Sequence, residues 1–472
     1  MRTTSRTDVA GWWVACLLGG VAGTAVVSLE WPQSAVAFLS GLGVLALGLA
    51  MVRGLSLAEV FCASVILVSP FSGILQNVSL GPVTVLGAWS GVCVVIAGLL
   101  WLASPRQTSS SSMWPLILLV CLGASSLIWF QPSKEGLQNL VVMSAFVLIT
   151  LLTASHVSAG GRLIAKISAA FAVASWIPVA VYGVSLGLWG LGNKVLVGPR
   201  PLATFSAIAL AWNLPQWRYG RRSALVRIVA ILATIVLSLS RSSIVTALLL
   251  LPLSRIRSRP RISDWVRMIL VIGLAVGLFY VAFTYFTPLR ERFTEGDVRT
   301  VGGAVSINVS GRDTMWSLTW HSYLESPWIG KGAGSAGKQV FEATGRLSHP
   351  HNDYLRILHD FGLVGLLLWV LGFTILVRRT WSAWRYADVS GSQVAHVHLA
   401  AFLSLAVLGL DMITANPIVY IFIMGPLGVL VGSSLGLSSI PATPQAPSAS
   451  YRASSRPGQG ASSSLDSASR GD

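Results

Sequence analysis

The sequence predicts an all-α membrane protein that crosses the bilayer many times. Of the 472 residues, 53% are hydrophobic and only 11% are charged, whereas charged residues make up about 25% of a typical soluble domain. The mean hydropathy is +0.70. Apolar runs of about 20 residues, the length that a helix needs to cross the hydrocarbon core, recur along most of the chain.

These apolar runs predict about twelve to fourteen transmembrane helices. The two short runs on either side of Arg241 can also be read as one re-entrant hairpin, which gives the lower number. The expected spans lie at about 11–29, 34–52, 56–75, 81–102, 114–130, 138–154, 163–184, 202–215, 225–239, 241–254, 268–287, 361–377, 396–415 and 417–436.

The pattern of apolar and polar sequence predicts four regions. Residues 1–287 form an N-terminal transmembrane bundle with a retained first span, and 288–360 form one large polar loop with short helices. Residues 361–437 return to the membrane as C-terminal transmembrane helices. The Ser/Pro/Ala/Gly-rich residues 438–472 are expected to be a disordered cytoplasmic tail.

The distribution of basic residues predicts the orientation. The formal net charge of +16 comes from short Lys/Arg clusters between apolar runs, for example SRIRSRPRISDWVR and RRTWSAWR, which is typical of cytoplasmic loops and not of nucleic-acid binding. The alternate loops, including 288–360, are poor in excess positive charge. We therefore expect this large loop at the periplasmic or extracellular face. The four cysteines all lie inside apolar runs and are expected to be small core residues.

Two motifs match only in part. Gly332–Gln339 reads GAGSAGKQ and fits the GxxxxGK part of a phosphate-binding loop, but Gln339 stands where a magnesium-binding Ser or Thr is needed. No strand is expected before it, so a flexible glycine loop that approaches a substrate is the better interpretation. Ala333 breaks the G-x-S-x-G pattern of serine hydrolases.

Three of the seven histidines fall in the single segment GRLSHPHNDYLRILHDFG, Gly345–Gly362. With His321 and Asp353 nearby they could supply metal ligands, but their spacing fits no structural zinc pattern. The chain also contains no DxD pair, a motif of metal-dependent transfer from nucleotide sugars. Neither a metal nor a cofactor is expected.

Three arginines are candidates for binding an anion. Arg241 interrupts the apolar sequence VLSLSRSSIVTALLL, where a guanidinium costs roughly 2.5–3.5 kcal/mol on insertion scales. Its fixed donors suit phosphate, although an arginine that snorkels to the outer rim is the alternative. Arg312 begins an amphipathic stretch and can also be read as a solvated helix-start residue, and Arg200 lies in VGPRPLATF on the same predicted face.

Four segments resemble the successive signatures of the O-antigen ligase and polymerase superfamily. They are SRSS at Ser240–Ser243, SGRDTMW at Ser310–Trp316, ESPWIGKGAGS at Glu325–Ser335 and HPHNDYLRILHDFGLVG at His349–Gly365. The resemblance implies a metal-independent glycosyltransferase in the bacterial cytoplasmic membrane. Its donor would be a glycan on polyprenyl (undecaprenyl) diphosphate, and its acceptor a hydroxyl of a glycan, glycolipid or protein at the outer face.

The resemblance also assigns roles to residues. The membrane-face arginine of the family falls on Arg241, the loop arginine on Arg312, and the histidine that precedes an asparagine on His351. His349 has no counterpart. Arg200 and Asn352 are further expected substrate-binding positions.

Elementary chemistry agrees with these roles. Loss of a lipid diphosphate develops negative charge on phosphate oxygens, which fixed arginines stabilise. A sugar hydroxyl is a poor nucleophile, so a neutral histidine would act as general base. His351 is expected just before a helix that runs to about Asp360, where the positive end of the helix dipole favours neutral imidazole. His359 is expected either on the same face or in a structural position.

Three alternatives stay open from the sequence alone. A polymerase of the same superfamily differs only in its acceptor, which would be another lipid-linked repeat. A membrane transporter would use Arg241 to bind a passing anion, although no inverted repeat is evident. A membrane hydrolase lacks its serine motif.

Overall fold

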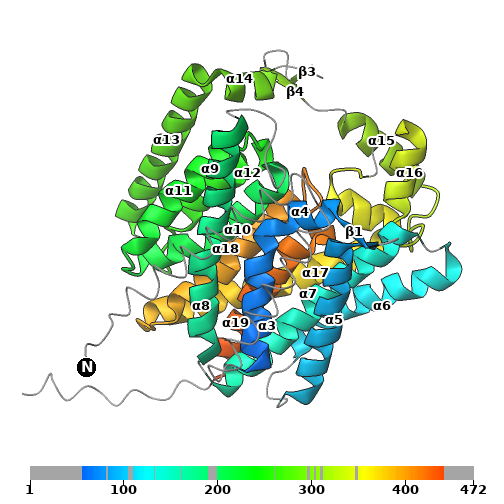
Figure 1. The fold of residues 1–472 in the computed structure, drawn as a ribbon, viewed down its shortest axis with the longest axis horizontal. Coiled ribbons are helices and arrows are strands. Elements are labelled where there is room, and N and C mark those ends of the chain that lie inside the picture. The colour runs from blue at the N-terminus through cyan, green and yellow to red at the C-terminus, as the bar shows by residue number, and fades with distance from the viewer. Residues whose placement is uncertain are drawn as a thin grey trace, which may run out of the picture. The chain divides into compact units, whose positions relative to one another are not determined.

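The computed structural model describes residues 56–80, 83–104, 110–131, 133–160, 162–189, 199–259, 261–294, 298–301, 305–308, 312–345 and 349–440. These residues are mainly helical (Figure 1). The described elements belong to one unit, Met1–Ser439. The expected spans at 11–29 and 34–52, together with Cys16 and the predicted tail from 441 onward, lie outside the described residues.

Up to residue 259, the helices follow one another closely, with one short antiparallel hairpin. The elements are α3 (Leu57–Val68), η1 (Ser69–Phe71), α4 (Ser72–Asn77), β1 (Ser79–Leu80), β2 (Val83–Thr84), α5 (Val85–Ala103), η2 (Ser110–Ser112), α6 (Trp114–Trp129), α7 (Lys134–Ala159), α8 (Arg162–Ala174), α9 (Trp176–Trp189), α10 (Pro199–Arg218), α11 (Ser223–Leu237) and α12 (Arg241–Leu253).

The second half contains the polar loop and the last three long helices. Its elements are α13 (Ile262–Tyr285), α14 (Thr287–Thr294), the antiparallel pair β3 (Val298–Val301) and β4 (Val305–Asn308), α15 (Arg312–Tyr323), α16 (Ser335–Thr344), α17 (Asp353–Val389), α18 (Ala395–Asp411), η3 (Pro417–Val419) and α19 (Ile421–Ser438). The β3–β4 hairpin in the polar loop was not predicted from the sequence.

The protein is an all-α polytopic membrane protein. Six described helices are long and apolar enough to cross a bilayer, and five shorter apolar helices accompany them. Each expected span that falls among the described residues coincides with one helix or with two or three consecutive helical elements. Local signals explain several helix starts: Ser56 and Glu59 form a capping box on α3, and Ser133 accepts a hydrogen bond from Gly136 N–H at the start of α7.

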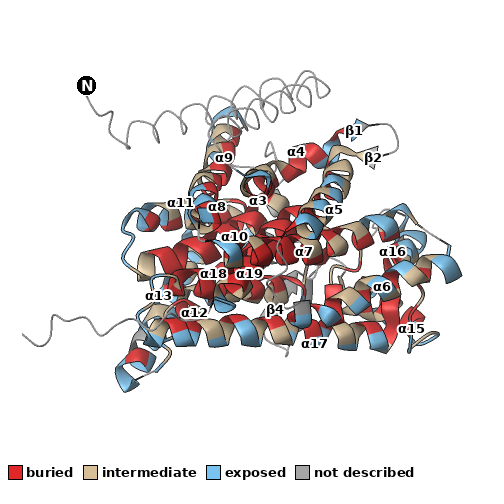
Figure 2. Cartoon of the chain, turned by 90° about the horizontal axis from the view of Figure 1, so that it is seen from below, coloured by how far each residue is buried: buried red, intermediate tan, exposed pale blue. Residues whose placement is uncertain are grey.

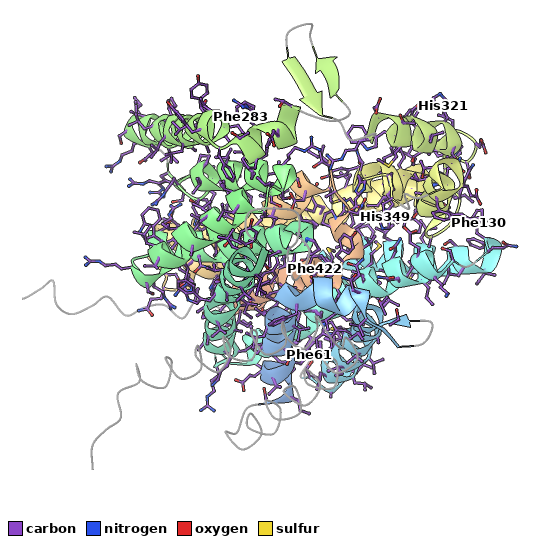
Figure 3. The ribbon with its side chains drawn as sticks, turned by 45° about the horizontal axis from the view of Figure 1, so that its top comes forward. Phe61, Phe130, Phe283, His321, His349 and Phe422 are labelled. Atoms are coloured by element: carbon purple, nitrogen blue, oxygen red, sulfur yellow. The ribbon has the colours of Figure 1, made fainter. Side chains whose placement is uncertain are left out.

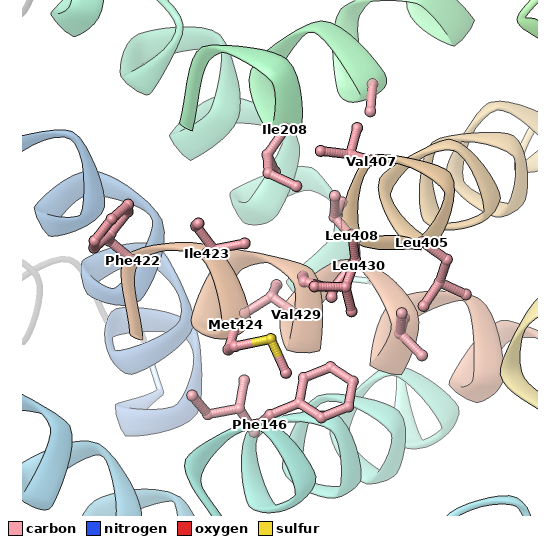
Figure 4. Close-up of a cluster of buried hydrophobic side chains, with 14 of the residues drawn as sticks. Phe146, Ile208, Leu405, Val407, Leu408, Phe422, Ile423, Met424, Val429 and Leu430 are labelled. Atoms are coloured by element: carbon pink, nitrogen blue, oxygen red, sulfur yellow. The ribbon is translucent and has the colours of Figure 1, made fainter. Parts of the chain in front are cut away.

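The core lies where α7, α10, α18 and α19 pack together, and buried residues are concentrated on these helices (Figure 2). Phe146 from α7, Ile208 from α10, Leu408 from α18 and Met424 from α19 meet in one apolar cluster (Figure 4). These helices are buried on nearly every side, so their sequences show no polar face.

A stripe of glycines brings α19 against α7. A Cβ atom built on Gly432 would lie 2.5 Å from Thr150 O, and one on Gly436 would lie 2.5 Å from Ala154 O. Only glycine permits such close backbone contact, which is a common way to pack helices in membranes. The backbones of α7 and α19 are therefore in close contact along this stripe.

Helix α17 is broken at Gly362, whose φ of 65° and ψ of −167° are not helical. The break frees backbone groups, and residues 327–332 satisfy them. Leu363 N–H donates to Pro327 O and Val364 N–H to Trp328 O, while His359 O and Asp360 O accept from Lys331 N–H and Gly332 N–H. Where a helix is interrupted away from water, its freed backbone N–H and C=O groups need such hydrogen-bond partners within the protein.

The cysteine prediction is correct in part. Cys62 and Cys93 are buried and free, as expected for small core residues. Cys121 is also free, but it is exposed. It lies on α6, a helix with only one well-buried face, and it points away from that face. The core prediction is therefore wrong for Cys121.

Candidate functional site

Side chains from six separate parts of the chain line one cavity of about 200 Å³. Arg241, Arg312 and His351, the three predicted catalytic residues, are all on its wall. The remaining lining residues are Gln76, Pro201, Thr204, Ser238, Leu239, Ser240, Ser242, Thr414, Ala415, Asn416, Pro417, Tyr420, Phe422 and Ile423. The structure thus brings together Arg241 and His351, which are 110 positions apart in the sequence.

Arg241 is the first residue of α12 and follows a tight turn from α11. Leu239 in that turn adopts a left-handed conformation with φ of 55°. Arg241 and Ser242, the first two residues of α12, both line the cavity, and the N-terminus of a helix favours an anion. One turn further along, Thr246 Oγ1 donates to Asp411 Oδ1 over 2.8 Å and ties α12 to the end of α18.

Arg312 is the first residue of α15. A hydrogen bond made by another residue of α15 holds this helix at the cavity. Trp316 Nε1 donates to Pro350 O over 2.8 Å, which links α15 to the residue just before His351. This hydrogen bond explains why the loop arginine and the histidine line one cavity although they are 39 positions apart in the sequence.

His351 precedes the first turn of α17, as predicted. Its φ is 53°, a left-handed conformation that is uncommon outside glycine and that costs of order 1–3 kcal/mol. Asn352 is the N-cap: its Oδ1 accepts from Leu355 N–H over 3.0 Å. Asn352 does not line the described cavity, so the structure gives its side chain a capping role, and contact with a substrate stays a prediction.

His349 has a different environment from His351. Its Nδ1 lies 3.0 Å from Glu135 Oε1 and 2.8 Å from the guanidinium of Arg356. The Arg356 guanidinium also donates to Glu135 over 3.1 Å and lies 3.4 Å from Asp353 Oδ1. We call Glu135, His349, Arg356 and Asp353 the internal ion cluster. His349 is partly buried, with 26% of its side chain exposed, while His321 lies at the outer edge on α15 (Figure 3).

His359 is buried and does not share the cavity with His351. Its Nε2 lies 3.0 Å from Ser322 Oγ, and its Nδ1 lies 3.1 Å from Ser335 Oγ and 3.4 Å from Asp360 Oδ1. This arrangement resembles a Ser-His-Asp triad. However, Ser322 is only 4% exposed and Lys331 Nζ donates to its Oγ over 2.8 Å. The group therefore holds the loop together.

Lys331 makes a second contact at the surface of this loop. Its Nζ donates to Glu325 Oε2 over 2.6 Å, and this hydrogen bond lowers the pKa of the Glu325 carboxyl. The contact joins the two ends of the turn between α15 and α16.

The glycine loop at 332–339 binds an anion, but the anion is the chain's own Asp360. Gly334 N–H donates to Asp360 Oδ2 over 2.9 Å and Ala336 N–H to Asp360 Oδ1 over 2.7 Å. A Cβ atom on Gly334 would come within 2.4 Å of Gly136 N. The expectation that this loop approaches a substrate is therefore wrong, because its amides and its open space are already used within the protein.

Two further predicted features are only partly described. Arg200 is in the first turn of α10, beside Pro201 and Thr204 of the cavity wall. Its side chain lies outside the described residues, so its role stays a prediction. Within the described part of the chain, no three His, Cys, Asp or Glu side chains are grouped so that they could hold a metal ion.

Sequence reasoning missed the lining contributed by the segment 414–423. The spans expected at 396–415 and 417–436 left a connection of one residue, whereas α18 ends at Asp411 and α19 begins at Ile421. Asn416 and Tyr420 both line the cavity. Polar residues such as Asp411 and Asn416 inside an apolar run were the signal that could have found this segment.

Residues 226–370 match the family model that is described as O-antigen ligase. This match supports the O-antigen ligase and polymerase superfamily that the sequence signatures predicted, for the segment 226–370. The matched segment contains Arg241, Arg312 and His351, but neither Arg200 nor Asn416. A search of curated proteins found no match.

Proposed function

We propose that this protein is a ligase that transfers a glycan from an undecaprenyl diphosphate donor to an acceptor hydroxyl. The observation that supports this most directly is the single cavity lined by Arg241, Arg312 and His351. Two guanidinium groups and one imidazole are the side chains that this reaction requires, because a diphosphate must leave and a hydroxyl must lose its proton.

In the proposed step, the acceptor oxygen attacks the anomeric carbon of the donor sugar while the bond between that carbon and the diphosphate oxygen breaks. The electron pair leaves with undecaprenyl diphosphate, and its developing charge is stabilised by Arg241 and Arg312. His351 takes the hydroxyl proton and later passes it to solvent. The products are a new glycoside and undecaprenyl diphosphate, so the chemistry balances without a cofactor.

The environment of each group supports its role. Arg241 stands at the start of α12, where the helix dipole adds to the attraction for phosphate oxygens. Arg312 is held next to the histidine segment by the hydrogen bond from Trp316 to Pro350. Two further serines of the turn, Ser240 and Ser242, line the same wall and could donate to the same anion.

The proposed location is the outer face of the bacterial cytoplasmic membrane, with the cavity open to the periplasm or exterior. The alternation of Lys/Arg-rich loops supports this orientation. Cysteines placed singly at Lys338 and at Arg257, after removal of the four native cysteines, test it. A membrane-impermeant maleimide should label position 338 in intact cells and position 257 only after permeabilisation. The reverse result would contradict both the orientation and the donor assignment.

Gene deletion followed by gel analysis of surface polysaccharide tests the function. A ligase predicts loss of attached glycan together with accumulation of lipid-linked polymer. A polymerase of the same superfamily, the runner-up, predicts products with a single repeat. A transporter predicts no release of undecaprenyl diphosphate when the purified protein is given a synthetic undecaprenyl diphosphate-linked oligosaccharide and a membrane glycolipid extract from the deletion strain.

A further inference from the structure

We propose that the turn between α15 and α16 inserts into the membrane leaflet on the cavity side and anchors the large loop to the lipid surface. We call residues 324–331 the interfacial turn. The sequence placed these residues in a polar loop, so a membrane contact was not expected there. The partner is phospholipid, at the boundary between head groups and acyl chains. This inference does not depend on the proposed reaction.

The interfacial turn exposes large apolar side chains. Leu324 is 54% exposed, Trp328 67% and Ile329 52%. One helical turn before Leu324, Trp320 on α15 is 46% exposed and adds a second indole. Single exposed apolar residues are common on protein surfaces and need no explanation. Several within residues 320–329 are instead typical of a surface that contacts a partner or a membrane.

The turn is bonded to the point where α17 begins to expose an apolar face. Just after the break at Gly362, Val364 N–H donates to Trp328 O over 3.1 Å. From there, Val364, Leu367 and Leu371 are 40%, 58% and 43% exposed, and their spacing places them on one side of the helix. Helix α17 is long and apolar enough to cross a bilayer. The lipid-facing surface of this span therefore continues into the interfacial turn.

The loop is also attached to the end of a second apolar helix, α6. Ala333 N–H donates to Ser126 Oγ over 3.1 Å, and α15, α16 and α6 lie at the same edge of the molecule (Figure 1 and Figure 2). The last two residues of α6, Ile128 and Trp129, are 80% and 66% exposed. Tryptophan is enriched where membrane helices meet the head groups. The turn is thus joined to two helices at the points where their apolar surfaces end.

The charged groups of the turn are compatible with an interfacial position. Lys331 Nζ donates to Glu325 Oε2 over 2.6 Å, and the Glu325 side chain is 71% exposed. Such a pair can stay among head groups and water while neighbouring apolar side chains lie deeper. The apolar face of an interfacial segment typically lies about 5–10 Å into the boundary. Because the turn directly follows α15, the anchor also holds the helix of Arg312 at the membrane surface.

A fluorophore in the full-length protein tests the depth of the turn. The four native cysteines are first replaced by serine. The variants Trp328→Cys and Leu324→Cys then carry the fluorophore NBD in phosphatidylcholine vesicles. Leu367→Cys supplies a lipid-facing reference on α17, and Lys338→Cys supplies a reference on α16, where the lysine side chain is 61% exposed. Quenching by phosphatidylcholine with a nitroxide on its acyl chain is compared with quenching by iodide on both sides of the membrane.

We expect the two labels in the turn to be quenched at least about twofold more by the nitroxide lipid, and at least about twofold less by iodide, than the label at position 338. The label at position 367 should also respond mainly to the nitroxide lipid. Trp328→Cys and Leu324→Cys change exposed side chains in separate places, so either one is sufficient if the other does not fold.

Three results would overturn the anchor. Turn labels that respond like position 338 would place the turn in water. Turn labels protected from both quenchers would mean that protein, such as a second copy of this chain, covers the turn. If position 367 also responds like position 338, the exposed face of α17 is not lipid-facing and the continuous surface is lost. None of these results affects the proposed transfer reaction, which the release of undecaprenyl diphosphate tests separately.

Discussion

The cavity wall and the internal ion cluster lie side by side and use the same kinds of side chain in opposite ways. In the cluster, His349 and Arg356 contact Glu135, and Arg356 also contacts Asp353. On the cavity wall, His351 and two arginines face a space of about 200 Å³. The rings of His349 and His351 are only 6.4 Å apart. The comparison teaches that two histidines one residue apart can have different surroundings: His349 contacts charged side chains, whereas His351 lines the cavity.

The largest expected effect is at His351. His351→Ala should reduce kcat about 100- to 10,000-fold because the acceptor hydroxyl loses its base, while donor binding is retained. His349→Ala should keep most of the activity, since its ring is directed to the internal ion cluster. Steady-state release of undecaprenyl diphosphate, with and without EDTA, measures both. Equal losses in the two variants together with inactivation by EDTA would replace the general base with a metal ion.

The two cavity arginines come next. Arg241→Ala or Arg312→Ala should remove about 2–4 kcal/mol of transition-state stabilisation, or roughly 30- to 1000-fold in rate. Lysine should rescue poorly, because its single ammonium lacks the planar fork of guanidinium. Turnover of each purified variant on the same donor measures the effect. Near-normal turnover of Arg241→Ala would mean that this arginine only extends to the membrane surface.

A change in the internal ion cluster should affect stability more than chemistry. Arg356→Met leaves the buried carboxylate of Asp353 without its cation and should lower the free energy of unfolding by about 3–5 kcal/mol. Arg378→Met, the same substitution at an exposed position of the same helix, should change it by about 0.5 kcal/mol or less. Thermal unfolding in detergent compares them. If folded Arg356→Met loses as much kcat as His351→Ala, the internal ion cluster takes part in catalysis and is not only structural.

The smallest effect is expected at Lys338, the lysine of the incomplete phosphate-loop pattern. Its side chain is 61% exposed and lies 3.9 Å from Glu342, a pair worth about 1 kcal/mol or less. Lys338→Ala should leave kcat and stability nearly unchanged, and ATP should have no effect on wild-type transfer. A rate that rises with ATP and is lost in Lys338→Ala would restore the nucleotide-site interpretation.

The sequence predicted the fold class, the helical segments, and the two arginines and one histidine that meet at the cavity. The apolar runs and the intramembrane Arg241 are local signals, whereas Arg312 and His351 were assigned through the family signatures that contain them. It did not predict the anion held by the glycine loop, because Asp360 and Gly334 meet only after the loop folds back onto α17. The contact of Asn416 with His351 joins residues that are 65 positions apart in the sequence. Such contacts depend on tertiary packing, and a local sequence pattern does not indicate them.

The break at Gly362 makes assembly of the cavity observable without any substrate. The N–H groups of Leu363 and Val364 bond to Pro327 and Trp328, not to the preceding turn of their own helix. Their protection from exchange with deuterated solvent therefore reports whether residues 327–332 have docked. Docking also fixes α15, which carries Arg312, against the segment that carries His351. Slow exchange at two amides should thus be a signature of a chain whose cavity is complete, even when that chain carries an inactivating substitution.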